Sequence, residues 1–347
     1  MSMAQKRTKL LLWGGGWFLC FLFTLSLAVT IGSVSIDFLT VWKSLAHHLL
    51  PFVSFHIDEA TDAIIWQLRL PRVLLAAVVG ASLAVAGVVF QALLRNPLAD
   101  PYILGVSAGS ATGAALAMIT GWGALWLGRG SISIFAFLGA CLALFFVLRL
   151  AQIGDQMRTG TLILSGVVVN ALFGAILTCI IALSPEEMQQ IQYWLMGGLG
   201  LREWKHLAVV TPVLFIGFTI SWLYSRELNL LGLGDRPATH LGVSVVKVRI
   251  FLLVIASLIT GVAVSVSGTI GFVGLVIPHL LRLLTGADHR TLLPLSMIAG
   301  ATFLVGADCI ARVLLSPIEI PIGVVTAFIG APFFAMILRK HQHKLSQ

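Results

Sequence analysis

Ten long apolar segments, separated by short polar stretches, follow one another along the chain. They cover residues 10–32, 63–92, 102–120, 131–150, 160–183, 205–225, 249–268, 273–285, 291–315 and 321–339. About 20 apolar residues in a helix span the hydrocarbon core of a bilayer, and lipid admits only helices and closed barrels as spanning structures. Only 10% of the residues are charged, against about 25% in an ordinary soluble domain. We therefore predict an all-α, polytopic transmembrane bundle of about ten spans, which forms one domain over residues 1–347.

The eighth segment, 273–285, is too short to cross a membrane alone in a straight line, and it follows a glycine-rich turn at 267–271. Such interrupted segments are tolerated where protein or a cavity covers the exposed backbone. One glycine-to-proline spacing also recurs in two stretches that would run in opposite directions, from Gly87 to Pro97 and from Gly268 to Pro278. This recurrence indicates an inverted repeat.

Basic residues are distributed unevenly between the two sides that ten spans create. With the N-terminus inside, 15 of the 22 Lys and Arg residues fall in inner segments and 7 in outer ones. Cytoplasmic loops carry an excess of Lys and Arg, so both termini are predicted to be cytoplasmic. Lys6, Arg7 and Lys9 precede a first apolar run that is longer than the core of a signal peptide, which favours an uncleaved first span. The sequence has no basic cluster interleaved with aromatic residues, so it gives no indication of nucleic-acid binding.

Signatures of catalysis are missing from the sequence. It contains no G-x-x-x-x-G-K-[ST] phosphate loop, no nucleophile elbow, no HExxH and no haem-attachment motif. The four cysteines lie apart in apolar segments, and we expect small core residues there, with no disulfide or metal role: Cys20, Cys141, Cys179 and Cys309. The sequence predicts a protein that is not an enzyme and holds no metal or cofactor of its own.

Ionisable residues are scarce within the predicted spans, whereas ion-coupled carriers usually place them there. Asp308 and Arg312 lie one helical turn apart near the outer end of the ninth span and are expected to pair. His279 is interpreted as a structural hydrogen-bonding side chain. The scarcity of buried acids disfavours secondary transport, so another source of free energy must drive any transport.

Three ordered stretches of the sequence carry a resemblance to a known family. They are RLPR at 69–72 with QALLRNPLADP at 91–101, GTIGFVGLVIPH at 268–279, and EIPIGVVT at 319–326 with GAPFF at 330–334. These stretches resemble the bacterial FecCD-type permeases, which import ferric siderophores, haem and cobalamin. The resemblance extends from about residue 10 to the end of the sequence.

The resemblance implies an importer that is assembled from several subunits. Two permease subunits, identical or paralogous, would surround a central path. Two cytoplasmic ATPase subunits, which hold ATP and Mg²⁺, would drive it, and an extracytoplasmic binding protein would deliver the substrate. The chain would lie in the bacterial plasma (inner) membrane as a multi-pass protein in contact with lipid, with both termini cytoplasmic and no nucleic-acid partner.

The resemblance also implies three sets of site residues. Arg69, Arg72 and Arg312, as positive charges exposed at the outer face, would dock acidic residues of the binding protein. Coupling to the ATPases would use the loop 226–248, in particular Leu233, Gly234, Asp235, Arg236, Pro237, Ala238, His240, Leu241 and Gly242. Thr159 and Gly160, at the start of the fifth span, would form an inner gate. The alternatives are headgroup anchoring for the arginines and a solvated connector for the loop.

The expected function is therefore that of a membrane-spanning permease subunit of an ATP-driven importer, translocating a ferric siderophore or related metal chelate. Haem or cobalamin import is the alternative within the same family. From other classes, an ion-coupled secondary transporter comes next. A structural membrane scaffold comes last, because a scaffold does not need broken, glycine-rich segments.

Overall fold

The computed structural model describes residues 3–32, 36–50, 52, 55–123, 128, 130–152, 157–200 and 202–345. Within these ranges the regular structure is helical and contains no strand. The long helices are α1 (Met3–Thr30), α4 (Leu70–Leu93), α7 (Gly130–Ala151), α8 (Thr159–Leu183), α10 (Trp204–Leu223), α13 (Val245–Ser267), α15 (His289–Val313) and α16 (Ile322–Leu345). The shorter elements are α2 (Phe38–Leu49), α3 (Glu59–Ala63), the π-helical turn η1 (Ile64–Arg69), the 3₁₀ turn η2 (Pro101–Leu104), α5 (Val106–Thr120), α9 (Met188–Leu195), α11 (Ser225–Leu231), α12 (Asp235–His240) and α14 (Val273–Thr285).

The predicted spans correspond to helices of the structure. Seven segments of the described chain are long and apolar enough to cross a membrane: α1, the continuous run from α3 to α4, α7, α8, α10, α13 and α15. Three further apolar helices, α5, α14 and the first part of α16, occupy the remaining predicted segments. The all-helical transmembrane bundle is therefore confirmed. At 13 residues, α14 is as short as the eighth apolar segment suggested.

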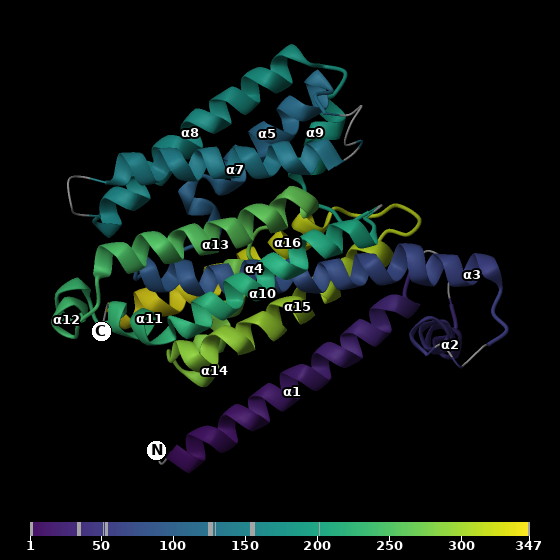
Figure 1. The fold of residues 1–347 in the computed structure, drawn as a ribbon, viewed down its shortest axis with the longest axis horizontal. Coiled ribbons are helices and arrows are strands. Elements are labelled where there is room, and N and C mark those ends of the chain that lie inside the picture. Colours follow the sequence, from purple (N-terminus) through teal and green to yellow (C-terminus); the bar gives the residue numbers. More distant parts are fainter. Residues whose placement is uncertain are drawn as a thin grey trace.

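Helix α4 occupies the centre of the bundle. In the most apolar stretch of the run from α3 to α4, 89% of the residues are buried inside the protein, whereas the share in α1 is 11%. Figure 1 shows α10, α13 and α15 running alongside α4, with α1 at the edge. The outer helices expose large apolar side chains, among them Phe23, Leu138, Leu164 and Ile216. Such surfaces suit lipid, which solvates apolar side chains as well as a protein core does.

Both ends of the chain lie at one end of the bundle. Figure 1 shows the N- and C-terminal ends near α11 and α12, whereas α2, α3 and α9 lie at the opposite end. This arrangement agrees with an even number of crossings. We call the end that holds α2, α3 and α9 the α9 end, and the end that holds α11 and α12 the α12 end.

Glycine allows three helix pairs to meet backbone to backbone. A Cβ added at Gly80 of α4 would collide with the carbonyl oxygen of Gly300 in α15. Gly87 of α4 meets Gly274 of α14 in the same way, and Gly109 of α5 meets the backbone of α7. Small residues that let helices approach closely are a main source of packing energy in membranes, so the first two contacts hold α15 and α14 against α4, and the third holds α5 against α7.

The two halves of the chain share one order of elements. In each, a long buried helix ends, the chain breaks, and a shorter helix begins next to a residue with positive φ: Gly105 before α5 and Phe272 before α14. The glycine-to-proline spacing that suggested a repeat does not mark equivalent positions, however. Gly87 lies inside α4 but Gly268 follows α13, so that sequence argument is wrong in detail.

The cysteines do not lie in the core as expected. Cys20 and Cys179 are exposed on α1 and α8, and Cys141 and Cys309 are partly exposed. All four are free thiols. The core interpretation failed because an apolar position in a span can face lipid as readily as protein.

Candidate functional site

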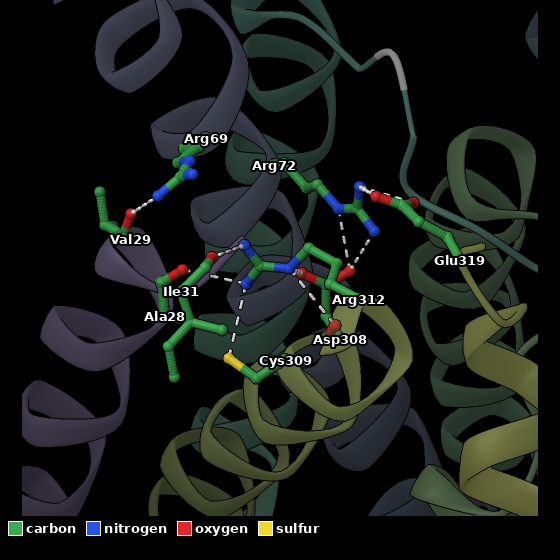
Figure 2. Close-up of polar contacts among 9 residues, drawn as sticks. All are labelled: Ala28, Val29, Ile31, Arg69, Arg72, Asp308, Cys309, Arg312 and Glu319. Atoms are coloured by element: carbon green, nitrogen blue, oxygen red, sulfur yellow. Dashed lines mark hydrogen bonds and ion pairs between the residues drawn. The ribbon is translucent and has the colours of Figure 1, made fainter. Parts of the chain in front are cut away.

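Two buried arginines close the C-terminal end of α1 (Figure 2). Arg69 ends η1 and Arg312 lies near the end of α15, and both guanidinium groups donate to backbone carbonyls of residues 28–31. The distances are 3.0 Å from Arg69 to Val29, 2.7 Å from Arg69 to Thr30, 3.0 Å from Arg312 to Ala28 and 2.5 Å from Arg312 to Ile31. The last carbonyls of a helix lack intrahelical partners, and positive charge there complements the helix dipole. The two side chains therefore cap α1.

Asp308 of α15 lies between Arg72 and Arg312. Its Oδ1 accepts a hydrogen bond from Nε of Arg72 at 3.0 Å, and its Oδ2 lies 3.0 Å from Nε of Arg312. Arg72 also reaches Glu319, with Nη1 2.9 Å from Oε2. The expected pairing of Asp308 with Arg312 is confirmed. We call Arg69, Arg72, Asp308, Arg312 and Glu319 the charge cluster.

The three arginines predicted to dock a binding protein gather in this cluster, but they are not exposed. Arg69 and Arg312 are 7% and 5% exposed, and the side chain of Arg72 is 13% exposed. The expected exposure is wrong because each guanidinium finds carbonyl or carboxylate partners inside the protein, where an unpaired charge would be costly. Glu319 is the most exposed of the five, at 45% of its side chain. Docking at these arginines stays a prediction.

A cavity of about 510 Å³ adjoins the charge cluster near α9. Its lining combines charged, polar and aromatic side chains, including Arg72, Gln190, Tyr193, Trp194, Arg202 and Glu319. Among the described residues, no carboxylate lies within ion-pair distance of Arg202. The cavity can therefore offer a cation and aromatic surface to a polar ligand at the α9 end.

Tyr102 joins the two breaks in the helical chain. It lies in η2, after α4, and its hydroxyl both donates to the carbonyl of Ile270 at 2.8 Å and accepts from its N–H at 3.1 Å. Ile270 lies in the break after α13, and Gly198 N–H donates to the carbonyl of Ser267, the last residue of α13, at 2.8 Å. Non-helical backbone at membrane depth must find partners within protein. The cover that the short eighth segment required is thus provided by η2 and by the segment after α9.

Gln91 connects the first two stretches that carried the family resemblance. Its Nε2 donates to the carbonyls of Gly274 and Leu275 at 3.3 and 3.2 Å, and its Oε1 accepts from Arg282 at 2.8 Å. Gln91, Gly274 and Leu275 lie in the stretches that carry the resemblance, but Arg282 lies three residues beyond the second of them. No local spacing predicts the contact, because 191 positions separate Gln91 from Arg282.

The predicted coupling loop folds into α11 and α12, at the end of the bundle that holds the chain termini (Figure 1). Gly234, with φ of +115°, makes the turn into α12. Ala238 is buried, whereas Leu233 and Leu241 are 65% and 54% exposed. The other predicted coupling residues exposed on this surface are Arg236, Pro237, His240 and Gly242. Exposed leucines among charged and polar groups suit contact with another protein.

The predicted gate residues begin α8. Thr159 is its first residue, with a buried hydroxyl that has no hydrogen-bond partner in the part of the chain that the structure describes. Apart from its chain neighbours and its own helical turn, no described residue lies within 4 Å of a Cβ placed on Gly160, so these residues leave open space there. A gating role for the two residues stays a prediction. Across the described ranges, no three His, Cys, Asp or Glu residues lie close enough together to hold a metal ion.

Comparisons with known proteins agree with this architecture. The family described as the FecCD transport family matches residues 19–340. The permease protein YvrB of Bacillus subtilis, an uncharacterised ABC transporter subunit, is 43% identical over 91% of this chain and 90% of its own length. The cobalamin import system permease protein BtuC of Halobacterium salinarum is 42% identical over 87% of this chain and 80% of its own length. The hemin transport system permease protein HmuU of Yersinia pestis is 38% identical over 95% of this chain and 96% of its own length.

One solved structure has the same fold over nearly the whole chain. It is an ABC transporter assigned to the metal-chelate type in an inward-facing conformation, with a TM-score of 0.82 and 34% sequence identity. The match covers 94% of this chain and 98% of the other. The family match over residues 19–340, the relatives and this fold agree with one another: the chain belongs to the FecCD transport family of ABC transporter permeases.

Proposed function

We propose that this chain is the permease subunit of an ATP-driven importer that translocates a ferric siderophore or related metal chelate across the plasma membrane. The observation that carries the proposal is the fold match to a metal-chelate type transporter along 94% of the chain. The cavity near α9 supports an anionic chelate, because Arg202 lines it without a carboxylate partner among the described residues. Haem or cobalamin is the alternative substrate, supported by relatives named for hemin and cobalamin transport.

In this proposal the energy comes from partner subunits. Two copies of the permease, or one copy with a paralogue, form the path, and two ATPases with ATP and Mg²⁺ bind α11 and α12. The exposed Leu233 and Leu241 support that contact. An extracytoplasmic binding protein docks on the α9 end near the charge cluster. ATP hydrolysis belongs to the partner, since the chain has no phosphate loop.

Reconstitution of the permease with its partner ATPase and binding protein tests the function. Proteoliposomes of the complex are expected to accumulate one of three radiolabelled chelates: a ferric siderophore, haem or cobalamin. Accumulation should require ATP enclosed in the vesicle lumen, on the side of the ATPase subunits. The identity of that chelate separates the proposal from its alternative. Uptake by the lone permease driven by a proton gradient would instead establish a secondary transporter.

Topology gives a second expected result. In a variant whose native cysteines are replaced by serine, a cysteine at Glu186, beside α9, is expected to react with an impermeant thiol reagent applied to intact cells. A cysteine at Arg236 in α12 should react only after permeabilisation, since the basic excess puts this end inside. The reverse pattern of labelling would invert the assignment of the two sides.

Docking of the binding protein gives a third. Glu319→Gln removes the exposed anion beside Arg72, so the outer surface becomes more positive. If the partner is acidic, it should associate faster with this variant at low salt, because charges at an interface act largely on the association rate. The difference should vanish near 1 M salt, where the Debye length is about 3 Å. Equal association rates of the two proteins at low salt would mean that the charge cluster has only a structural role at α1 and α4.

A further inference from the structure

Arg249 lies inside the α12 end of the protein and is bonded to two separate segments. It belongs to the first turns of α13 and is 1% exposed. Nη2 lies 2.7 Å and Nη1 3.3 Å from the two carboxylate oxygens of Asp235. Nη1 also donates to the carbonyl of Met157 at 2.7 Å. One planar guanidinium thus holds a bidentate carboxylate and a backbone oxygen in a fixed geometry.

The two partners of Arg249 belong to elements with different proposed roles. Asp235 is the first residue of α12, the helix proposed to contact the ATPase. Met157 comes two residues before Thr159, the first residue of α8 and a proposed gate residue. The guanidinium is therefore a direct bridge between the coupling helix and the start of α8.

A second arginine connects Asp235 to the central helix. Arg95, just after α4, has its Nη2 3.6 Å from Oδ1 of Asp235. Its side chain is 41% exposed, so this contact is weaker than the buried one. Through Asp235, α12 is thus linked both to the end of α4 and, by way of Arg249, to the start of α8.

Asp235 remains charged under physiological conditions. Partial burial favours its neutral form, but the hydrogen bond and charge of Arg249, with the charge of Arg95, outweigh burial and hold the pKa of Asp235 below its ordinary value. The bridge therefore persists at neutral pH, and a rise in pH does not release it.

The bridge differs from an ordinary surface ion pair. Surface pairs loosen easily because water replaces the partner. Arg249 has no such substitute at 1% exposure, so breaking its bonds leaves a buried charge, which is strongly unfavourable. The buried bonds therefore resist separation of Arg249 from Asp235 of α12 and from the carbonyl of Met157.

We propose that Arg249 is a positioning residue that transmits movement of the coupling helix α12 to the start of α8 and so controls the cytoplasmic opening of the transport path. This inference rests on the proposed function, since it needs an ATPase that moves α12. It assigns to a buried side chain outside the predicted coupling loop the task of linking that loop to the predicted gate.

The test follows the environment of residue 160 during ATP turnover. Gly160→Cys, in a background without native cysteines, places a thiol in open space at the start of α8. In the reconstituted complex its reaction with a cytoplasmic thiol reagent is expected to change when ATP is added. Arg249→Met, which keeps an apolar stem but removes every hydrogen bond, should abolish that change. It should also lower the substrate transported per ATP hydrolysed by about five- to tenfold, at the lower end of coupling between protein sites.

Two further variants complete the test. Arg249→Lys retains the charge without the bidentate fork and should be intermediate. Asp235→Asn, at a residue whose side chain is 39% exposed, removes the carboxylate with little risk to folding and should also weaken coupling. The matched control is Asp288→Asn, which removes another carboxylate at this end, one that accepts hydrogen bonds from Asn229 and the backbone of Arg290. The control should couple normally.

The outcomes separate this inference from the proposed function. If the wild-type complex transports with ATP but Arg249→Met and Asp235→Asn keep the ATP-dependent change at residue 160 and normal transport per ATP, Arg249 is only structural. If the wild-type complex itself does not transport with ATP, the proposed function fails. If Arg249→Met does not assemble, Asp235→Asn alone decides the inference by the same labelling readout.

Discussion

Asp308→Ala is expected to destabilise the protein by about 3–5 kcal/mol, the usual effect of removing one partner of a buried ion pair. The Asp308 side chain is 1% exposed and contacts both Arg72 and Arg312. Without it, the partners of Arg312 among the described residues are carbonyls and a thiol, in a site where its side chain is 4% exposed. Thermal unfolding in detergent, followed by size-exclusion chromatography with fluorescence detection, measures the loss.

The matched control lies on the same arginine. Glu319→Gln removes the other carboxylate of Arg72, but Glu319 is 45% exposed, so the change should stay within about 1 kcal/mol. Equal stability losses for both variants would mean that burial of Asp308 contributes nothing, and would contradict the structural role of the charge cluster.

The spans could be predicted from the sequence because lipid imposes a strict rule on every crossing. A crossing segment has to be apolar and has to satisfy its own backbone, so hydropathy alone locates it. The short α14 was also visible, since the glycine-rich turn before it limits its length. Which faces of these helices touch protein was not visible, as the exposed Cys20 and Cys179 show.

The burial of the docking arginines was beyond the reach of sequence patterns. The partners of Arg69 and Arg312 are backbone carbonyls at the end of α1. Every residue carries a backbone carbonyl, so the sequence does not mark which of them an arginine will contact. Contacts that span 40 and 281 positions also leave no local spacing to read. By contrast, Asp308 and Arg312 lie four residues apart on one helix, and their pairing was predicted correctly.

The bridge through Arg249 was missed for a related reason. The sequence placed Asp235 in the coupling loop by resemblance, but Arg249 reads as an ordinary basic residue at the inner end of a span. Its position 14 residues after Asp235 becomes meaningful only when α12 folds back onto the first turns of α13. The bridge is therefore a property of the tertiary fold, and no motif of the sequence contains it.

Gly300→Ala is expected to separate α15 from α4 and lower the stability of the bundle. A Cβ at this position would lie 2.5 Å from the Cβ of Ala84 and 2.5 Å from the carbonyl oxygen of Gly80. No flexible side chain can yield there, so the two helices must move apart, and overpacking of this kind costs about 1–3 kcal/mol. In a membrane the loss is not offset by hydrophobic burial, since close packing itself holds the helices together. Gly306→Ala, on the same helix, is the matched control, because no described residue outside its own helical turn lies within 4 Å of a Cβ placed there. Thermal unfolding of the two purified variants in the same detergent measures the difference, and the midpoint should fall for Gly300→Ala but not for Gly306→Ala. If both variants unfold at the wild-type temperature, α4 and α15 do not make the backbone contact that places the charge cluster between them.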